Sequence, residues 1–141
     1  MTERPPLMTR LLKLQDEAGY VSASAARELA EEYGIAPAQL YSLMSFFDGL
    51  RTRPAGRQDI RVCFGTACYE KGAPIIYERL RDELQIKPFT DTTEDGEVTV
   101  EQVYCLGACS RAPLLVINQV IHGRVKSHQV PVMVRKLDKA P

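Results

Sequence analysis

The sequence has no excess of charge and no long apolar run, and each absence excludes a class of protein. Lysines plus arginines number 18 and acids number 18, so the formal net charge is zero, whereas a nucleic-acid binder usually carries a basic excess. The longest uninterrupted apolar stretch, Ala112 to Ile117, is far short of the roughly 20 residues that cross a bilayer. Residues Met1 to Pro6 lack the apolar core of a secretory signal. These absences predict a soluble cytoplasmic protein that spans no membrane and binds no nucleic acid.

Nucleotide-binding fingerprints are also missing. The chain has neither a Gly-x-Gly-x-x-Gly motif nor a Walker loop, so nothing in it indicates that it binds NAD itself. It has no internal repeat and no low-complexity segment. Its apolar fraction of 45% is enough to bury a core. The length suits one ordinary domain, or a compact domain with a helical extension.

Apolar residues recur at helical spacing in the first fifty residues. Three apolar stripes predict three helices: Leu7, Leu11, Leu14 and Ala18; then Ala26, Leu29, Ala30 and Tyr33; then Leu40, Leu43, Met44 and Phe47. Gly19 and Gly34 are natural helix stops. Ser22 or Ser24 can cap the second helix, and Pro37 suits the first turn of the third. We interpret most of these residues as packing among the helices.

The composition changes between Arg51 and Arg57, where proline, glycine and three arginines, including Arg53, indicate a linker. A docking surface is the alternative interpretation of these arginines. The predicted organisation is therefore a helical head at residues 1–50, a linker at 51–57 and a second domain at 58–141.

Strand-like and helix-like segments alternate after the linker. Short apolar runs predict strands around Ile60 and Val62, over Val98 to Val103, over Leu114 to Ile117 and over Val120 to His122. Helices are predicted from Pro74, with Ile76, Tyr77, Leu80 and Leu84 on one side, and near the end, with Val130, Val134 and Leu137 inward. The fold class is therefore predicted as α/β, a helical bundle followed by a small β-α-β-β-α unit.

All four cysteines lie in two short motifs, Cys63-Phe-Gly-Thr-Ala-Cys68 and Cys105-Leu-Gly-Ala-Cys109. Each motif begins at the end of a predicted strand and contains a glycine, Gly65 or Gly107. A 2Fe–2S cluster on four thiolates is negatively charged, and backbone N–H groups aimed at its sulfurs stabilise it. Glycine lets the backbone approach closely. We also expect the amino end of a helix after Cys68 to contribute its dipole.

Other uses of four cysteines fit this spacing less well. Structural zinc and thioredoxin-type redox pairs usually show a two-residue gap, and neither motif has one. A Rieske-type cluster takes two histidine ligands, but His122 and His128 lie outside both motifs. Disulfides are rare in the cytoplasm. The spacing favours a 2Fe–2S cluster and leaves a zinc-stabilised interaction module open.

With their neighbours, these motifs resemble the thioredoxin-like 2Fe–2S subunit of NADH-dependent oxidoreductases, which lies beside the flavoprotein in the peripheral arm of respiratory complex I. Similar subunits occur in NAD-linked hydrogenases, including electron-bifurcating ones, and in NAD-linked formate dehydrogenases. The matching stretches are Gly19 to Val21, Pro37 to Tyr41, Ser45 to Phe47, Val62 to Cys68 with Gly72-Ala73, and Cys105 to Cys109 with Ala112-Pro113. Leu50 departs from the resemblance, because relatives often carry an aromatic residue there.

The resemblance implies a thioredoxin-like fold that holds one 2Fe–2S cluster, with Cys63 and Cys68 on one iron and Cys105 and Cys109 on the other. It also implies that loop residues provide the polar backbone around the sulfurs: Gly65, Thr66, Ala67, Gly107 and Ala108. FMN and NAD(H) are expected in a partner flavoprotein subunit, and further iron–sulfur subunits are expected as neighbours. The chain would then be a non-catalytic electron-transfer subunit. A free-standing ferredoxin is the alternative, against which the helical head argues, because a carrier needs only the cluster domain.

Overall fold

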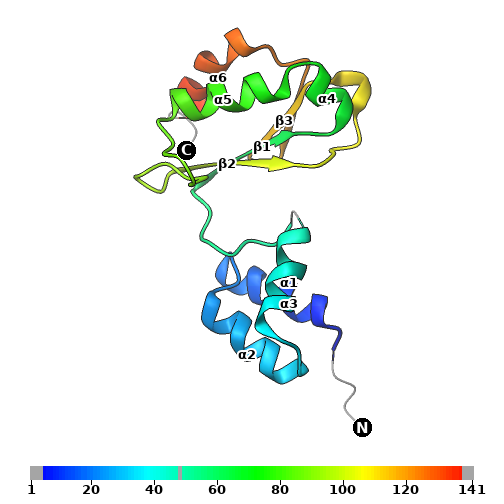
Figure 1. The fold of residues 1–141 in the computed structure, drawn as a ribbon. Helices are drawn as coiled ribbons and strands as arrows, with labels where there is room; N and C mark the ends of the chain where they lie inside the picture. Colours follow the sequence, from blue (N-terminus) through cyan, green and yellow to red (C-terminus); the bar gives the residue numbers. More distant parts are fainter. Residues whose placement is uncertain (1–4, 48, 138–141) are drawn as a thin grey trace. The chain divides into compact units, whose positions relative to one another are not determined.

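The chain is organised as two compact units that divide between Pro54 and Ala55. The structure, a computed structural model, describes residues 5–47 and 49–137 (Figure 1). Within those ranges, no helix combines the length and the apolar character that a membrane crossing requires.

The first unit packs helices α1 (Leu7–Ala18), α2 (Ala23–Tyr33) and α3 (Pro37–Phe46) around its own core. The buried side chains of this core are Leu11, Val21, Ala26, Leu29, Ala30, Leu40, Met44 and Leu50. Gly19 and Gly34 end α1 and α2 in the left-handed conformation, with φ of 80° and 65°. Ser22 caps α2 by accepting a hydrogen bond from the Ala25 N–H at 3.2 Å. The predicted helices, stops and cap are therefore confirmed.

Two residues of the predicted stripes are not part of this core. Phe47 is 41% exposed, because α3 ends at Phe46 and the backbone of Phe47 is extended, so its side chain leaves the helical face. Ala18, at the last position of α1, is also exposed. In α1 and α3, the last residue of the predicted apolar stripe is therefore not buried.

The chain leaves the first unit through a segment that one side chain holds in place. The side-chain amide of Gln15 donates to the Gly49 carbonyl, and its oxygen accepts from the Arg51 N–H at 2.6 Å. The Arg51 carbonyl in turn accepts from the Val21 N–H at 2.7 Å. Leu50 and Arg51 therefore belong structurally to the helical unit.

The second unit contains a mixed four-stranded sheet in the order β2-β1-β3-β4. Its strands are β1 (Gln58–Cys63), β2 (Val98–Val103), β3 (Leu114–Ile117) and β4 (Val120–Gly123). The first two strands run parallel, whereas β3 is antiparallel to both β1 and β4. Asn118 and Gln119, both with positive φ, join β3 to β4 in a two-residue turn. The four predicted strands are confirmed.

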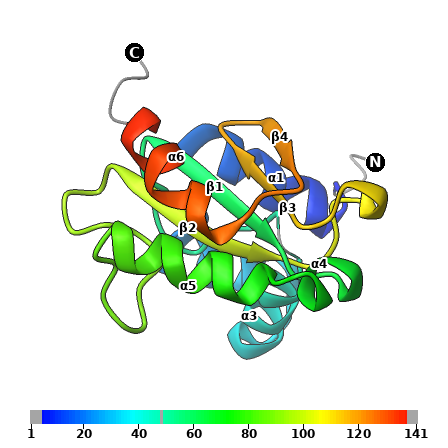
Figure 2. The ribbon, with the colours of Figure 1, turned by 90° about the horizontal axis from the view of Figure 1, so that it is seen from above.

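Helices cover one face of this sheet. The parallel pair needs a crossover connection, which α4 (Thr66–Glu70) and α5 (Ala73–Glu83) provide. Figures 1 and 2 both show α5 and α6 (Val130–Leu137) lying over the strands. Ile76 and Leu80 of α5 are buried in the same core as Ile60, Val100 and Leu115 of the sheet, and Val130, Val134 and Leu137 pack into it as predicted.

The sheet topology sets the place of the cysteines. In the parallel pair, Cys63 is the register partner of Val103, and in the antiparallel pair, Val62 is the partner of Leu115. The ends of β1 and β2 and the start of β3 therefore meet at one edge of the sheet. Cys63 ends β1, and Cys105 follows β2 by two residues.

Candidate metal centre

The two cysteine loops, residues 63–68 and 105–109, lie against each other at this edge of the sheet. The Phe64 N–H donates to the Val103 carbonyl at 2.7 Å, which ties the start of the first loop to the end of β2. Between the loops, Cys63 Sγ donates to the Tyr104 carbonyl at 3.9 Å. The structure thus brings together two cysteine motifs that are far apart in the sequence.

Gly65 is required where the loops touch. A Cβ atom at this position would lie 2.9 Å from the Tyr104 carbonyl oxygen and 3.5 Å from Cys105 Sγ. The first of these distances is shorter than real Cβ contacts, so any larger residue would force the loops apart. Gly65 therefore lets the backbone of the first loop approach a thiol of the second.

The four thiols differ in exposure. Cys63 and Cys68 are each 1% exposed and belong to the core of the second unit. Cys105 and Cys109 are exposed. None of the four forms a disulfide, so all of them are free to act as ligands.

A helix does follow Cys68, as expected, because α5 begins at Ala73, but Cys68 itself lies in a short helix that was not predicted. The helix α4 begins at Thr66, with Gly65 as its N-cap, so Cys68 lies inside it rather than before it. The next helix, α5, begins at Ala73 after Gly72, whose φ is 93°. The apolar periodicity that predicted a helix belongs to α5. The single turn of α4 around Cys68 is too short to show such a period.

The surroundings of Cys68 favour its neutral thiol in the metal-free chain. Burial raises the pKa of Cys68 most, and a hydrogen bond with Cys63 raises that pKa further. A backbone hydrogen bond with Leu114 acts in the opposite direction, and the nearby charges that Cys63 and Cys109 can carry raise the pKa again. These interactions place three cysteines within electrostatic range of one another, beside the start of β3.

A backbone group also points at one of the exposed thiols. The Gly107 N–H donates to Cys105 Sγ at 3.4 Å, and Gly107 adopts a φ of 77°, which favours glycine. Cys109 begins the short 3-10 turn η1 (Cys109–Arg111), for which Ala108 is the N-cap.

The remaining predicted loop residues lie at the same edge of the sheet. Thr66 is exposed at the first position of α4, whereas Ala67 and Ala108 are half-buried and pack against the core. His122 is half-buried on β4, and His128 is exposed on the turn η2 (Ser127–Gln129), so neither histidine lies in a cysteine loop.

Sequence reasoning missed two groups that form hydrogen bonds with the cysteine thiols. They are the Tyr104 carbonyl, which accepts from Cys63, and the backbone of Leu114, which bonds to Cys68. Both are main-chain groups, and a main-chain group leaves no mark in the residue type. The only available signal was position, because Tyr104 precedes Cys105 and Leu114 begins a predicted strand shortly after Cys109.

This donor set fits a 2Fe–2S cluster. Such a cluster takes four thiolates, two on each iron, and is stabilised by hydrogen bonds to sulfur. The four cysteines, the N–H of Gly107 and the close approach at Gly65 provide these features. Across residues 5–47 and 49–137, no three or more histidine, cysteine or acidic side chains are grouped to hold a metal ion.

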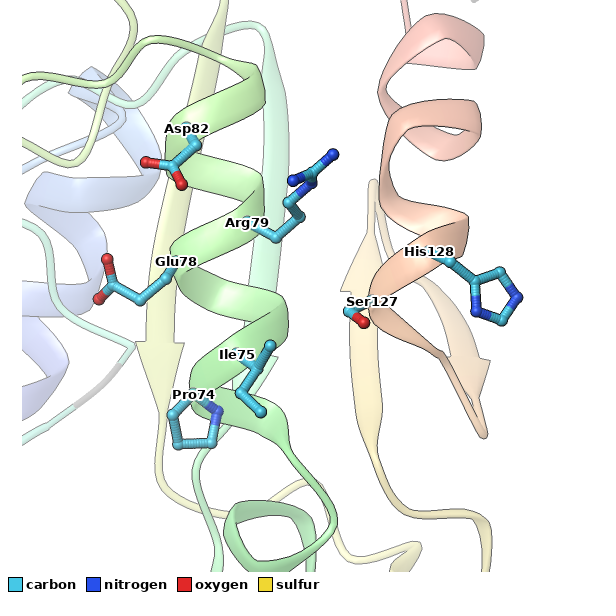
Figure 3. Close-up of a pocket in the computed structure, with 7 residues that line it drawn as sticks. All are labelled: Pro74, Ile75, Glu78, Arg79, Asp82, Ser127 and His128. Carbon is cyan, nitrogen blue, oxygen red and sulfur yellow. The ribbon is translucent and has the colours of Figure 1, made fainter.

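A concave region away from the cysteines lies between α5 and η2 (Figure 3). It is lined by Pro74, Ile75, Glu78, Arg79, Asp82, Ser127 and His128. Figure 3 shows Glu78 and Asp82 on the side of α5 away from Ser127, and His128 pointing away from α5. Because these polar groups do not converge, this groove does not form a site like that of the cysteines.

The family of the chain follows from comparison with known sequences. The model of the thioredoxin-like [2Fe–2S] ferredoxin family matches residues 2–138. The chain therefore belongs to this family, and its fold is an N-terminal helical bundle followed by a thioredoxin-like ferredoxin domain.

Individual relatives are subunits of larger enzymes. The chain is 32% identical over 124 residues to the NADP-reducing hydrogenase subunit HndA of Solidesulfovibrio fructosivorans, covering 88% of this chain and 72% of that protein. It is 32% identical over 115 residues to an NADH-quinone oxidoreductase subunit of Mycobacterium bovis. That match covers 82% of this chain but only 45% of the mycobacterial protein, so the chain spans about half the length of that relative.

A solved structure shares the fold. The NAD+-reducing [NiFe]-hydrogenase in its air-oxidised state matches 93% of this chain with a TM-score of 0.67 and 22% sequence identity. The match covers 23% of the hydrogenase chain.

Proposed function

We propose that this chain is the electron-transfer subunit of a multisubunit NAD(H)-dependent oxidoreductase, and that it carries one 2Fe–2S cluster. The observation that carries this proposal is the convergence of the two cysteine loops, with Gly65 against Cys105, in a chain of the 2Fe–2S ferredoxin family. Its relatives in hydrogenase and NADH-quinone oxidoreductase complexes support the same role. When bound, such a cluster supplies one-electron transfer.

The ligands in this proposal are the four cysteines. Cys63 and Cys68 hold one iron, and Cys105 and Cys109 hold the other. The remaining loop residues orient the backbone around the sulfurs, and they are Gly65, Thr66, Ala67, Gly107 and Ala108. In this proposal the two pairs differ in role. Cys63 and Cys68 are buried and would anchor the cluster in the core, whereas Cys105 and Cys109 are exposed and would hold it at the surface.

Hydride transfer from NADH moves two electrons together, and a flavin is the usual converter to single electrons. The chain lacks a dinucleotide fingerprint. We therefore assign FMN and NAD(H) to a partner flavoprotein subunit in the cytoplasm, with further iron–sulfur subunits beyond it. In this arrangement the chain is not catalytic alone.

The helical head is the part of the chain that favours a complex subunit over a free-standing ferredoxin. It has a core of its own, and among residues 5–47, 49 and 50 none belongs to the core that contains Cys63 and Cys68. We propose residues 1–50 as a docking domain, 51–57 as its linker and 58–141 as the cluster domain. The linker arginines Arg51, Arg53 and Arg57 would contribute to docking, and Arg57 also pairs with Glu97 at 2.9 Å within the cluster unit.

A paired assay on anaerobically purified full-length chain tests the proposal. Metal analysis should give about two irons per chain, and the loaded chain alone should not oxidise NADH. Addition of the copurifying flavoprotein with FMN should restore NADH-dependent reduction of an artificial acceptor. Stoichiometric zinc without iron would overturn the cluster, and NADH turnover by the flavin-free chain would overturn the division of labour.

A further inference from the structure

Charge is distributed unevenly along the cluster unit, although the whole chain is neutral. Residues 102–137 contain no aspartate or glutamate, yet they contain five lysines and arginines. Residues 78–101 show the reverse balance, with eight acids and three bases. A neutral protein with separated charge has an electric field that can orient it toward a partner.

The fold gathers part of the basic segment next to the cysteine loops. After the β3–β4 hairpin the chain returns beside η1, where the Arg124 N–H donates to the Arg111 carbonyl at 2.7 Å. Gly123 makes this approach possible, because a Cβ there would lie 2.9 Å from Arg111 Cβ and 3.0 Å from Arg111 Nε. The side chain of Arg111 therefore packs over Gly123, and two arginines far apart in the sequence become neighbours.

A groove adjoins this pair of arginines. Lys71 lies on its wall, as do Arg124 and Lys126, and Ala112 and Pro113 are among its buried apolar residues. We call the exposed side chains of Lys71, Arg111, Arg124 and Lys126 the basic surface.

Two residues of the basic surface closely follow the cysteine loops along the chain. Lys71 directly follows α4, the helix that contains Cys68. Arg111 is the last residue of η1, the turn that Cys109 begins. A cation of the basic surface therefore follows Cys68 and Cys109 by three and two residues, respectively.

These four cations are not neutralised within the part of the chain that the structure describes. Arginines and lysines elsewhere in residues 5–47 and 49–137 form ion pairs, such as Arg79 with Glu83 at 2.9 Å, but none of these pairs includes a residue of the basic surface. Glu70, the acid next to Lys71 in the sequence, is exposed and takes part in none of these pairs. The charge of the basic surface is available to an external partner.

We propose that the basic surface docks an acidic surface of the protein subunit that exchanges electrons with this chain. The inference rests on the proposed function and adds the face of contact and the charge of the partner. A protein fits better than a small anion, because the cations surround an apolar groove and Ile75 at its edge is 64% exposed. An apolar centre with a polar rim is the usual composition of a protein interface. Complementary charge speeds the encounter and fixes its orientation.

The test compares two full-length, cluster-loaded variants of equal charge. The first combines Lys71→Gln, Arg111→Gln, Arg124→Gln and Lys126→Gln. The control combines Arg79→Gln, Lys87→Gln, Arg135→Gln and Lys136→Gln, which are exposed cations outside the groove. The probe is the purified flavoprotein subunit, and the association rate is measured at low and at high salt. A third variant, Lys71→Gln with Lys126→Gln, keeps Arg111 in place over Gly123 in case the first does not fold.

The first variant should associate on the order of tenfold more slowly at low salt and lose most of its salt dependence. The double variant should show a smaller change in the same direction, and the control should stay within about twofold of the parent chain. An equal loss in the control, or unchanged rates in the folded basic-surface variants, would overturn the proposal.

Further measurements distinguish a failure of this docking proposal from a failure of the proposed function, and distinguish docking from simple anion binding. If the parent chain exchanges no electrons with the flavoprotein at any concentration, the proposed function fails, whatever the variants do. If the variants exchange electrons normally at saturating partner concentration, the function stands and only docking is affected. Binding of inorganic phosphate or duplex DNA that these substitutions abolish, with partner association unchanged, would make the surface an anion site and overturn the docking role.

Discussion

The two cysteine loops of the proposed cluster site have different structural supports. In residues 63–68 the cysteines lie at the end of β1 and inside α4, and both are buried. In residues 105–109 they lie in irregular backbone after β2 and at the start of η1, and both are exposed. A site built this way has one side fixed by the core and one side open to the surface, which suits a centre that must hold its cofactor and still deliver electrons.

The backbone hydrogen bonds of the two loops also differ. The Gly65 carbonyl accepts from the N–H groups of Cys68 and Tyr69, both at 2.9 Å, which closes the first turn of α4. The second loop contains short turns, such as the one in which the Ala112 N–H donates to the Cys109 carbonyl at 3.1 Å.

The largest difference between the two loops should appear when one buried cysteine and one exposed cysteine are each replaced by serine. In Cys68→Ser, a hydroxyl enters the core in place of a thiol, which adds a cost of about 1–3 kcal/mol to the lost ligand. We expect almost no iron in this variant, whereas Cys109→Ser should retain a labile fraction. Iron per chain and thermal unfolding of both variants check this. Equal iron content in the two would show that burial does not distinguish the pairs.

Gly65→Ala should have the next largest effect, because its Cβ meets the Tyr104 carbonyl at 2.9 Å. A backbone oxygen cannot rotate away as the end of a side chain can, so the two loops must separate. Iron loading should therefore fall to well under half of that of the parent chain. The visible absorption of the reconstituted chain measures this. Gly49→Ala is the matched control, because nothing lies within 4 Å of its added Cβ and its φ is not positive; a similar loss there would contradict the steric explanation.

Gly107→Ala should have the smallest effect. Its Cβ has open space around it, so only the φ of 77° opposes the substitution, at a cost of about 1 kcal/mol. Asparagine tolerates this conformation better, so Gly107→Asn should recover part of the loss in denaturant unfolding. If Gly107→Ala removed as much iron as Gly65→Ala, the second loop would be as constrained as the first.

Much of the fold was predictable because hydrophobic periodicity reports burial directly. Leu11 and Leu29 follow the period of a helix and Ile60 and Val62 that of a strand, and all four are buried. The cysteine spacing and glycines indicated the cofactor class, because those residue types carry the chemistry. The family match confirms the class of protein that the motifs indicated.

The features of the fold and site that could not be predicted depend on contacts between segments that are distant in the sequence. No local pattern shows that Cys68 is buried and Cys109 is exposed, because the layers packed over each loop decide it. The place of Arg111 beside Arg124 depends on the return of the β3–β4 hairpin, which the sequence does not encode locally. The short helix α4 escaped detection because a five-residue element shows no period.

The hydrogen bonds of Gln15 have a consequence for how the chain binds as a whole. These bonds hold Gly49 and Arg51 on the helical unit, and the Gly56 N–H is bound to Thr99 Oγ1 at 2.6 Å in the other unit. Of the proposed linker, residues 52–55 are therefore the part between these two attachments. Such a segment spans at most roughly 14 Å. Once either unit is seated on a shared partner, the other is therefore kept near that partner at an effective concentration on the order of millimolar. Two weak contacts joined in this way hold a partner far more tightly than either contact alone.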